Sequence, residues 1–246
     1  RQALIHAGLS PETVSLTIDR ACCSSLTAIQ LGRKSILLDE ASICMAVGAE
    51  NMSNTPIVIN GHRWGTHLEK PILVDHLNPI MYVGFKSIAA DAGQIALEYN
   101  VTREMQDEWA FNSQMKYQHA KKTGKFMIGE ELIAVPIPSK KGDDLILEED
   151  EFPKPNSTLE KLAKLKPVYE SPTVTAGNSP GLDSGAAAII ITKRSTAESL
   201  GLNPLGIILS VGSIAREPHL VAEVPAYAIQ QALDRAGLSL DDLNLI

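Results

Sequence analysis

The sequence has few cysteines, few aromatic residues and no long apolar run. Three cysteines in 246 residues cannot form the disulfide framework of a small secreted domain, so a reducing, cytoplasmic compartment is the expectation. No apolar stretch approaches the roughly 18–20 residues that cross a bilayer as a helix. Aromatic residues make up only 4%, but apolar residues reach 44%, enough for one large globular domain or two smaller ones.

Positive charge is also in short supply. Lys and Arg number 22 against 29 Asp and Glu, which leaves a formal charge of −7. Nucleic acids and anionic membranes recruit clustered Lys and Arg, so neither is the expected partner.

A repeat links the two ends of the chain. Residues 2–10 read QALIHAGLS, and residues 231–239 read QALDRAGLS. Each copy predicts a helix end, a Gly cap and a short acidic turn, which suggests two related half-domains. Chance is the alternative, because such helix ends are common. The chain opens on Arg1 and stops on Ile246 inside an apolar stretch, so we expect an internal piece of a longer protein, with any targeting signal out of view.

The first part of the chain predicts a βαβ unit. Residues 15–19 are short and β-rich, 24–38 form a helical window, and 43–47 form a buried apolar run. Such units build parallel sheets with helices on both faces.

The rest of the chain alternates between predicted helices or strands and irregular segments. Residues 51–100 read as irregular and 139–166 as a charge-rich surface excursion, whereas Thr102 predicts the cap of a helix that ends at Gly124. The apolar residues of that helix suit one packed face; they are Met105, Trp109, Phe111 and Met115. The later elements expected are strands over 186–192 and 207–211, a helix ended by Gly201, and a helix over 225–236.

Cys22 lies at the predicted turn between a strand and a helix. A thiol there faces the unpaired N–H groups and the positive dipole end of the helix, which favour the nucleophilic thiolate and suit a developing oxyanion. The alternative is a small buried cysteine at a helix start. Cys23 is expected to serve packing, and Cys44 to be a core residue.

Five motifs, in this order along the chain, resemble those of the thiolase family. They are DRACCSSL at 19–26, GAENMS at 48–53, TREMQD at 102–107, TAGNS at 175–179 and GAAA at 185–188. The resemblance implies an α/β fold of duplicated halves with an inserted loop domain, of which only part is present. It assigns residues 1–53 and 173–201 to the N-terminal core half, 54–172 to the inserted CoA-binding loop domain, and 202–246 to the beginning of the C-terminal half.

The resemblance also implies an activity. Thiolases transfer acyl groups between a cysteine and coenzyme A, by thiolysis or by Claisen condensation. Cys22 matches their nucleophile, which carries the acyl group as a thioester and predicts ping-pong kinetics. Two alternatives stay open: a ketoacyl-synthase-like condensing enzyme, or a non-catalytic thiolase-like subunit that binds acyl-CoA or a partner enzyme.

By the same resemblance, CoA or acyl-CoA is a substrate, and no separate cofactor is expected. Its phosphates are expected near Lys154 and Lys161, and its pantetheine arm along Tyr169, Ala176 and Ser179. A solvated charge run is the alternative explanation for the two lysines.

Several positions depart from the family pattern. Ser87-Ile88-Ala89 replaces the usual His-Met-Gly step, Pro180 replaces a second Ser of the Gly-rich turn, Asp183-Ser184 replaces Asn-Asp, and Ser25 replaces a Gly. Since Pro has no N–H and no hydroxyl, one hydrogen bond to CoA must be absent or replaced. These changes affect the expected substrate more than the expected reaction class.

Family members draw an Asn, a His and a second Cys from a segment that would lie beyond Ile246, so we expect this chain alone to turn over no substrate. No metal site is expected, because the spacing of His62, His67 and His76, with Glu69 and Asp75, fits no zinc pattern. The family implies a homodimer or homotetramer in which the region after Ser53 reaches across subunits.

Overall fold

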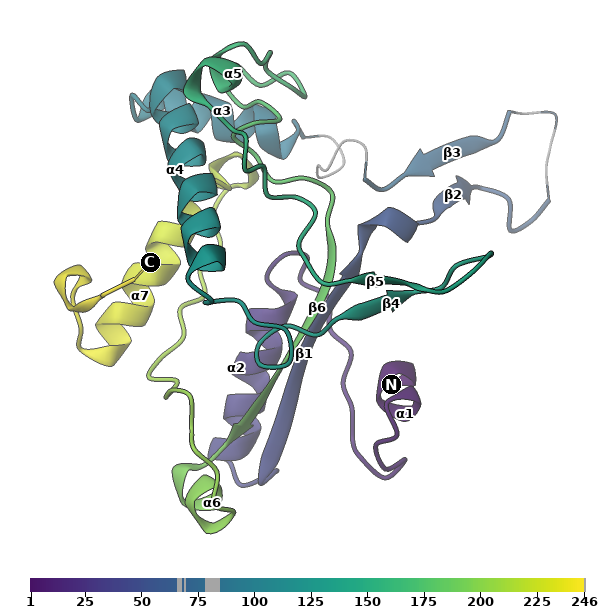
Figure 1. Cartoon of the computed structure of the whole chain (residues 1–246), viewed down its shortest axis with the longest axis vertical. Helices are drawn as coiled ribbons and strands as arrows, with labels where there is room; N and C mark the ends of the chain where they lie inside the picture. The colour runs from purple at the N-terminus through teal and green to yellow at the C-terminus, as the bar shows by residue number, and fades with distance from the viewer. Residues whose placement is uncertain (66–67, 69, 78–84, 246) are drawn as a thin grey trace. The chain divides into compact units, whose positions relative to one another are not determined.

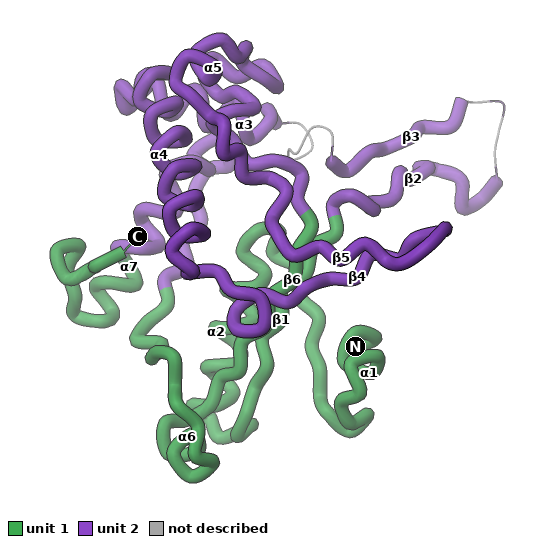
Figure 2. Tube along the Cα trace, viewed as in Figure 1, with its two compact units in different colours: residues 1–51, 184–211, 231–246 green, residues 52–183, 212–230 purple. Residues whose placement is uncertain are grey.

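The computed structural model describes residues 1–65, 68, 70–77 and 85–245. The chain divides into two compact units (Figure 2). The first unit holds residues 1–51, 184–211 and 231–246, and the second holds 52–183 and 212–230. Each unit is described by itself below.

The first unit carries the longest strands of the described chain. Its elements are α1 (Gln2–His6), α2 (Ser24–Leu37), β1 (Ile43–Asn51), β6 (Ser184–Thr192), α6 (Arg194–Ser199), the end of α7 (Val224–Ala236) and the short helix η3 (Leu240–Asp242). The predicted helices over 24–38 and 225–236 and the predicted strands over 43–47 and 186–192 are therefore confirmed. Gly201, with φ of +66°, follows α6 as expected.

β1 and β6 form a two-stranded sheet, against which α2 packs (Figure 1). The register pairs Ile43 with Thr192 and Asn51 with Ser184. The small core of this unit is Ile36 from α2, Ala46 from β1 and Ile191 from β6. The pairing is antiparallel. The parallel pair that the βαβ pattern predicted, between residues 15–19 and 43–47, is not formed among the described strands, because residues 15–19 have no regular structure. A helix between two apolar runs does not by itself decide which strands become neighbours.

Two predicted strands do not form. Residues 15–19 and 207–211 have no regular structure, and Leu16 and Ile207 are exposed. A strand needs a neighbour for its N–H and C=O groups, and no described strand pairs with either segment. Local β propensity was therefore insufficient at both places.

The two copies of the sequence repeat share their backbone geometry. Gly8 and Gly237 adopt φ of +80° and +69°, which ends a helix in the left-handed conformation that glycine tolerates. Leu9 N–H donates to Leu4 C=O at 3.2 Å, and Leu238 N–H donates to Leu233 C=O at 3.0 Å. The predicted equivalence of the two helix ends is confirmed at the level of single hydrogen bonds.

The second unit is built from short elements around one long helix. They are η1 (Met52–Asn54), β2 (Ile57–Asn60), β3 (Ile72–Asp75), α3 (Ile88–Glu98), α4 (Arg103–Lys122), β4 (Val135–Ile137), β5 (Leu145–Leu147), α5 (Leu159–Ala163), η2 (Pro218–Leu220) and the start of α7. The strands form two antiparallel hairpins, β2–β3 and β4–β5. The expectation that residues 51–100 are irregular was wrong, because they contain α3, η1 and the β2–β3 hairpin.

α4 begins where the sequence predicted, but another face is packed. The Thr102 side chain accepts a hydrogen bond from Met105 N–H, and Gly124 follows the helix end with φ of +70°. Trp109 is 77% exposed, whereas Asp107 is the buried residue of the helix. Phe111 and Met115 are half-buried and follow Asp107 at helical spacing. The apolar pattern predicted the wrong packed face, because a charged residue, Asp107, occupies the centre of the face that is buried.

The 139–166 excursion is mostly exposed, as expected, although Leu162 of α5 is buried. The assignment of residues 54–172 to an inserted loop domain, and of 202–246 to a second half, stays a prediction.

Candidate active site

The turn before α2 is held by the side chains on either side of Cys22. Asp19 Oδ1 accepts a hydrogen bond from Ala21 N–H at 2.9 Å. Ser24 Oγ accepts from Arg20 N–H at 2.7 Å and donates to Ala21 C=O at 2.8 Å. These three bonds close the loop on both sides of the cysteine, so the position of Cys22 is set by its immediate neighbours.

The backbone at this turn is strained. Ala21 adopts φ of +45°, a left-handed conformation that costs a residue with a Cβ about 1–2 kcal/mol. Strain of this kind persists only where surrounding contacts enforce it, and it is concentrated at functional sites. Cys22 follows directly and is exposed, so its thiol is open to a substrate.

The other two cysteines differ from each other. Cys23 is the N-cap residue of α2 and is exposed, so the expectation that it serves packing was wrong. Cys23 occupies the first position outside the helix, and a residue there stays exposed when no other element packs against that helix end. Cys44 is half-buried against the core of Ile36 and Ile191, in line with its predicted core role.

The first turn of α2 offers backbone donors beside Cys22. Ser24 N–H bonds to Ala21 C=O at 3.0 Å, and Thr27 N–H bonds to Cys23 C=O at 3.0 Å. Within the described residues no hydrogen bond is made by the N–H groups of Ser25 and Leu26. Such first-turn N–H groups point out of the helix N-terminus and suit a negative charge, the environment that a developing oxyanion requires.

A glycine in β1 lets the strand approach this turn. A Cβ added to Gly48 would clash with the Ser25 side chain. Since both residues belong to the first unit, Gly48 sets how closely the helix start lies against the sheet. Ser25, one of the departures from the family pattern, therefore occupies the space that a glycine leaves free in β1.

In the second unit, Tyr169 lies in a strained hairpin turn. Tyr169 and Glu170 have φ of +51° and +60°, and Ser171 N–H closes the turn on Val168 C=O at 3.0 Å. Ser87 Oγ donates to Tyr169 C=O at 2.7 Å and also caps α3. Ser87, where the family has a His, thus anchors this turn. Tyr169 itself is exposed.

A buried polar network holds the loop that carries Ala176 and Ser179. Asp107 Oδ1 accepts from Asn178 Nδ2 at 3.0 Å, and Asp107 Oδ2 accepts from Arg103 Nε at 2.9 Å. Asn178 Oδ1 accepts in turn from Thr175 N–H at 2.8 Å, and Thr175 is fully buried. Because each of these buried polar groups has a partner, the network fixes the loop without an uncompensated charge.

Ala176 and Ser179 lie on either side of Asn178 in this loop. Ala176 is exposed, whereas Ser179 is half-buried and donates its hydroxyl hydrogen to Thr175 C=O at 2.8 Å. Gly177 packs on α5, since an added Cβ would lie 2.5 Å from the side chains of Leu162 and Leu165. Ala176 is therefore presented on the outside of a closely packed loop.

Lys154 and Lys161 bracket the turn that precedes α5. Lys154 Nζ donates to Glu151 C=O at 3.3 Å, and Lys161 Nζ donates to Asn156 C=O at 2.7 Å. In the described part of the chain neither ammonium group has a carboxylate partner. Their charges remain available to an anion. The five predicted CoA-contacting residues thus share the second unit, and Cys22 lies in the first.

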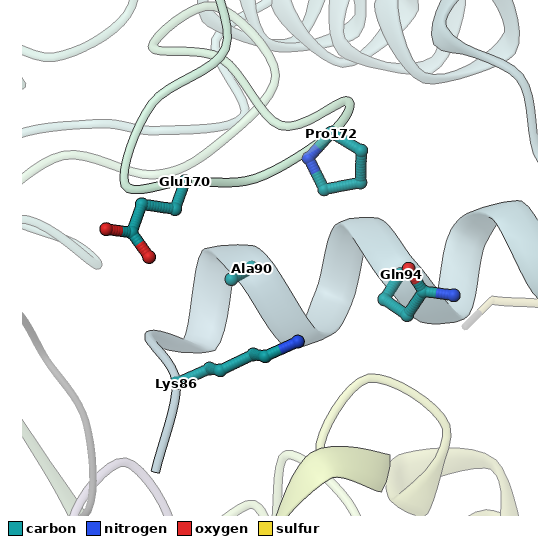
Figure 3. Close-up of a pocket in the computed structure, with 5 residues that line it drawn as sticks. All are labelled: Lys86, Ala90, Gln94, Glu170 and Pro172. Atoms are coloured by element: carbon teal, nitrogen blue, oxygen red, sulfur yellow. The ribbon is translucent and has the colours of Figure 1, made fainter.

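A shallow cavity of about 280 Å³ lies beside the Tyr169 turn. Lys86, Ala90 and Gln94 face it from α3 and the residue before its cap, while Glu170 and Pro172 come from the turn (Figure 3). It brings one cation and one carboxylate to the surface next to a predicted CoA-contacting residue. Sequence analysis did not predict this cavity, because α3 lies in the segment that was expected to be irregular.

Among the described residues no cluster of His, Cys, Asp and Glu suits a metal ion, and no described helix has the length and apolarity to span a membrane. His67 and Glu69, considered above as metal ligands, lie outside the described residues.

The polar network was missed by sequence reasoning, although two signals for it were present. Arg103 and Asp107 are spaced i,i+4 on a helix, which allows an ion pair. Asn178 belongs to the TAGNS motif, where an amide between small residues is typical of a loop-fixing role.

Comparison with known proteins was made by sequence and by structure. A family model described as "Thiolase, N-terminal domain" matches residues 1–195. Acetyl-CoA acetyltransferase of Cupriavidus necator is 38% identical over 252 residues, which cover 100% of this chain and 63% of that protein. A probable acetyl-CoA acyltransferase of Staphylococcus epidermidis is 34% identical over 251 residues, with the same coverage of 100% and 63%.

Two solved structures share the fold. Bacillus anthracis acetyl-CoA acetyltransferase superimposes with a TM-score of 0.92 at 30% identity, covering 100% of this chain and 62% of that one. Human mitochondrial 3-ketoacyl-CoA thiolase superimposes with a TM-score of 0.88 at 32% identity, covering 98% and 61%. The chain thus spans 63% of the length of the curated relatives named above. It has part of a thiolase-like α/β fold, and it belongs to the thiolase family.

Proposed function

We propose that the protein is an acyl-CoA C-acyltransferase of thiolase type, in which Cys22 carries the acyl group. The observation that carries the proposal is an exposed thiol after a strained residue, at a helix start where two N–H groups have no partner among the described residues. Membership of the thiolase family supports the reaction class, and the relatives named above are acetyl-CoA acetyltransferases and acyltransferases.

In the first step the Cys22 thiolate attacks the thioester carbon of acyl-CoA. The carbonyl oxygen becomes an oxyanion, for which the N–H groups at the start of α2 supply donors. Collapse of this intermediate expels the CoA thiolate, which takes a proton, and leaves an acyl thioester on Cys22. In the second step the thiolate of CoA, or the α-carbanion formed when a second acyl-CoA loses an α-proton to a base, attacks the thioester carbon. The bond between this carbon and the sulfur of Cys22 breaks, and the Cys22 thiolate is released.

The CoA moiety is proposed to bind along the second unit. The ammonium groups of Lys154 and Lys161 lack carboxylate partners among the described residues, which suits the phosphates of CoA. Ala176 and Ser179 lie on a loop held by buried hydrogen bonds, and Ser87 holds the turn that carries Tyr169. Both segments offer a rigid support for a flexible pantetheine arm. The proposal needs no cofactor besides CoA itself.

A homodimer or homotetramer in the cytoplasm is part of the same proposal. The β2–β3 hairpin that follows Ser53 exposes apolar side chains, among them Ile59 at 54% and Leu73 at 63%, and exposed apolar surface of this kind marks interaction sites. All three cysteines are free, which suits a reducing compartment.

The kinetic test separates the two half-reactions. Transfer of label from free CoA into acetyl-CoA, with no second acyl-CoA present, requires an acyl-enzyme intermediate. We expect this exchange in the protein as the cell makes it, although not in residues 1–246 alone. We expect its loss in Cys22→Ala and its retention in the neighbouring variant Cys23→Ala. Exchange that survives in Cys22→Ala would contradict the role of Cys22. Binding of CoA without any exchange would favour a non-catalytic acyl-CoA-binding subunit instead.

A further inference from the structure

The structure has a second cavity, which lies in the first unit and is lined by positively charged side chains. It has a volume of about 250 Å³ and lies between α2, residues 209–211 and the end of α7. The residues that line it all belong to the first unit (Figure 2). Three of its lining side chains are cationic: Arg33, Lys34 and Arg235. Its other polar side chains are Gln30 and Ser210, and no carboxylate lines it.

Backbone carbonyls hold both guanidinium groups in place. Arg33 Nη2 donates to Leu209 C=O at 3.4 Å, and Arg235 Nη1 donates to Val211 C=O at 2.6 Å. Each arginine has five N–H donors, so most of them stay available after these bonds. Ser210 lies between the two carbonyls, and its hydroxyl ties this segment to Ala232 C=O of α7 at 2.5 Å. The two arginines are thus positioned by the same short stretch of chain.

Helix-end electrostatics do not account for this cluster. A cation in the last turn of a helix is favoured by the dipole, and Lys34 and Arg235 occupy the last turns of α2 and α7. That effect explains one cation for each helix, but it does not explain three around one cavity without a counter-charge. Cations this close repel one another unless an anion lies between them.

The missing counter-charge is notable in an acidic chain. The protein has a formal charge of −7, and the ion pairs formed among its described residues use Arg103, Lys121, Lys193 and Arg216. None of the three cavity cations takes part in them. Carboxylates are plentiful, yet the described structure brings none to this cavity.

We propose that this cavity binds a phosphate group. The paired guanidinium groups suit the bidentate contacts that phosphate oxygens make with arginine. The cavity is somewhat smaller than the ligand pockets of about 300–1,000 Å³ that hold drug-sized molecules, so it fits a small, highly charged group. The site shares no residue with the predicted CoA-contacting set, which belongs to the second unit.

Calorimetric titration with inorganic phosphate, at an ionic strength held constant with chloride, tests the proposal. Loss of charge-assisted bonds at two arginines predicts at least about tenfold weaker binding in the R33Q/R235Q variant. The variant Lys122→Gln removes an exposed cation of the second unit and is the matched control, with unchanged affinity.

The R33K/R235K variant keeps both charges, so it tests the proposal even if the neutral variant R33Q/R235Q does not fold. It is expected to bind phosphate more weakly than the wild type, because an ammonium group cannot form the bidentate contact. A parallel titration with adenosine 5′-monophosphate distinguishes two kinds of ligand. A site for phosphomonoesters would bind the monophosphate more tightly than free phosphate, whereas a site for free phosphate would not. No phosphate or monophosphate binding, or equal affinity in wild type, R33Q/R235Q and R33K/R235K, would overturn the proposal.

Discussion

At the scale of single residues, the cysteine turn depends on close contacts more than on buried area. Ala21 is strained, Asp19 and Ser24 hold it with hydrogen bonds, and Gly48 gives Ser25 the space it needs. Each contact restricts where the thiol of Cys22 can lie. Small changes at these positions should therefore affect acylation more than their size suggests.

Gly48→Ala tests the close approach of β1 to α2. The added methyl group clashes with the Ser25 side chain, and overpacking of this kind costs about 1–3 kcal/mol of unfolding free energy. We expect urea denaturation to show that loss, together with slower acylation of Cys22. Gly185→Ala, in the paired strand with nothing near its added Cβ, is the matched control. Adding Ser25→Gly should restore stability, and a double variant as unstable as Gly48→Ala would disprove the clash.

Asp107→Asn tests the buried network under the Ala176 loop. The neutral amide has one oxygen in place of two, so it cannot accept from both Arg103 and Asn178 as the carboxylate does. Loss of a hydrogen bond to a buried charge predicts a decrease of about 1.5–3 kcal/mol in unfolding free energy. Glu108→Gln, an exposed change at the next position of α4, should leave stability unchanged. Equal stabilities of the two variants would refute the role of the network.

At the scale of elements, the sequence predicted those whose signals are local. Thr102 and Gly124 mark the ends of α4, and Gly201 and Gly237 mark the ends of α6 and α7. These signals act through caps and left-handed glycines within a few residues of the helix end. The apolar strands β1 and β6 were predicted as well, because a short apolar run bounded by turns favours a strand over a helix by its length.

The elements that were missed depend on contacts distant in sequence. Residues 15–19 and 207–211 have strand-like composition but no pairing partner in the described structure. α3 was overlooked because small residues such as Ala90 and Gly93 weaken its apolar pattern, yet they allow the Ser171 loop to approach. Likewise, Cys22 was found from its position at a turn, whereas the Asp107 network joins residues too far apart in sequence for pattern reading.

The contact between α3 and η2 predicts a response to alkaline pH. The Tyr99 hydroxyl donates to Glu223 at 2.7 Å, and this hydrogen bond and the charge of Glu223 raise the pKa of Tyr99 to about 12. Because the folded-state pKa lies above the ordinary value of 10.0, the contribution of Tyr99 to stability is complete below pH 10 and is lost as pH rises through 12. Tyrosinate absorbance, compared between the wild type and Tyr99→Phe, should reveal one late-titrating tyrosine. In Glu223→Gln its midpoint should fall toward 10.0, and an unchanged midpoint would rule out Glu223 as the cause.

At the scale of the whole molecule, the exposed β2–β3 hairpin leads to a prediction about assembly. Ile59→Lys places a charge on an apolar strand that we propose contacts another subunit, so it should shift the protein toward smaller species in sedimentation experiments. Leu145→Lys makes the same change on the exposed β4–β5 hairpin, where Leu145 is 63% exposed, and should leave assembly unchanged. An identical oligomer size for wild type and Ile59→Lys would contradict the assignment of this hairpin to a subunit contact.

The role of Cys22 is tested most directly by the intact mass of the protein, as the cell makes it, after incubation with acetyl-CoA, followed by peptide mapping. We expect an acetyl increment on the peptide that contains Cys22, present in Cys23→Ala and absent in Cys22→Ala. A panel of longer acyl-CoA donors would then show which acyl groups the thiol accepts. An increment that persists in Cys22→Ala, or none from any donor although CoA binds, would contradict the assignment of Cys22 as the acyl-carrying nucleophile.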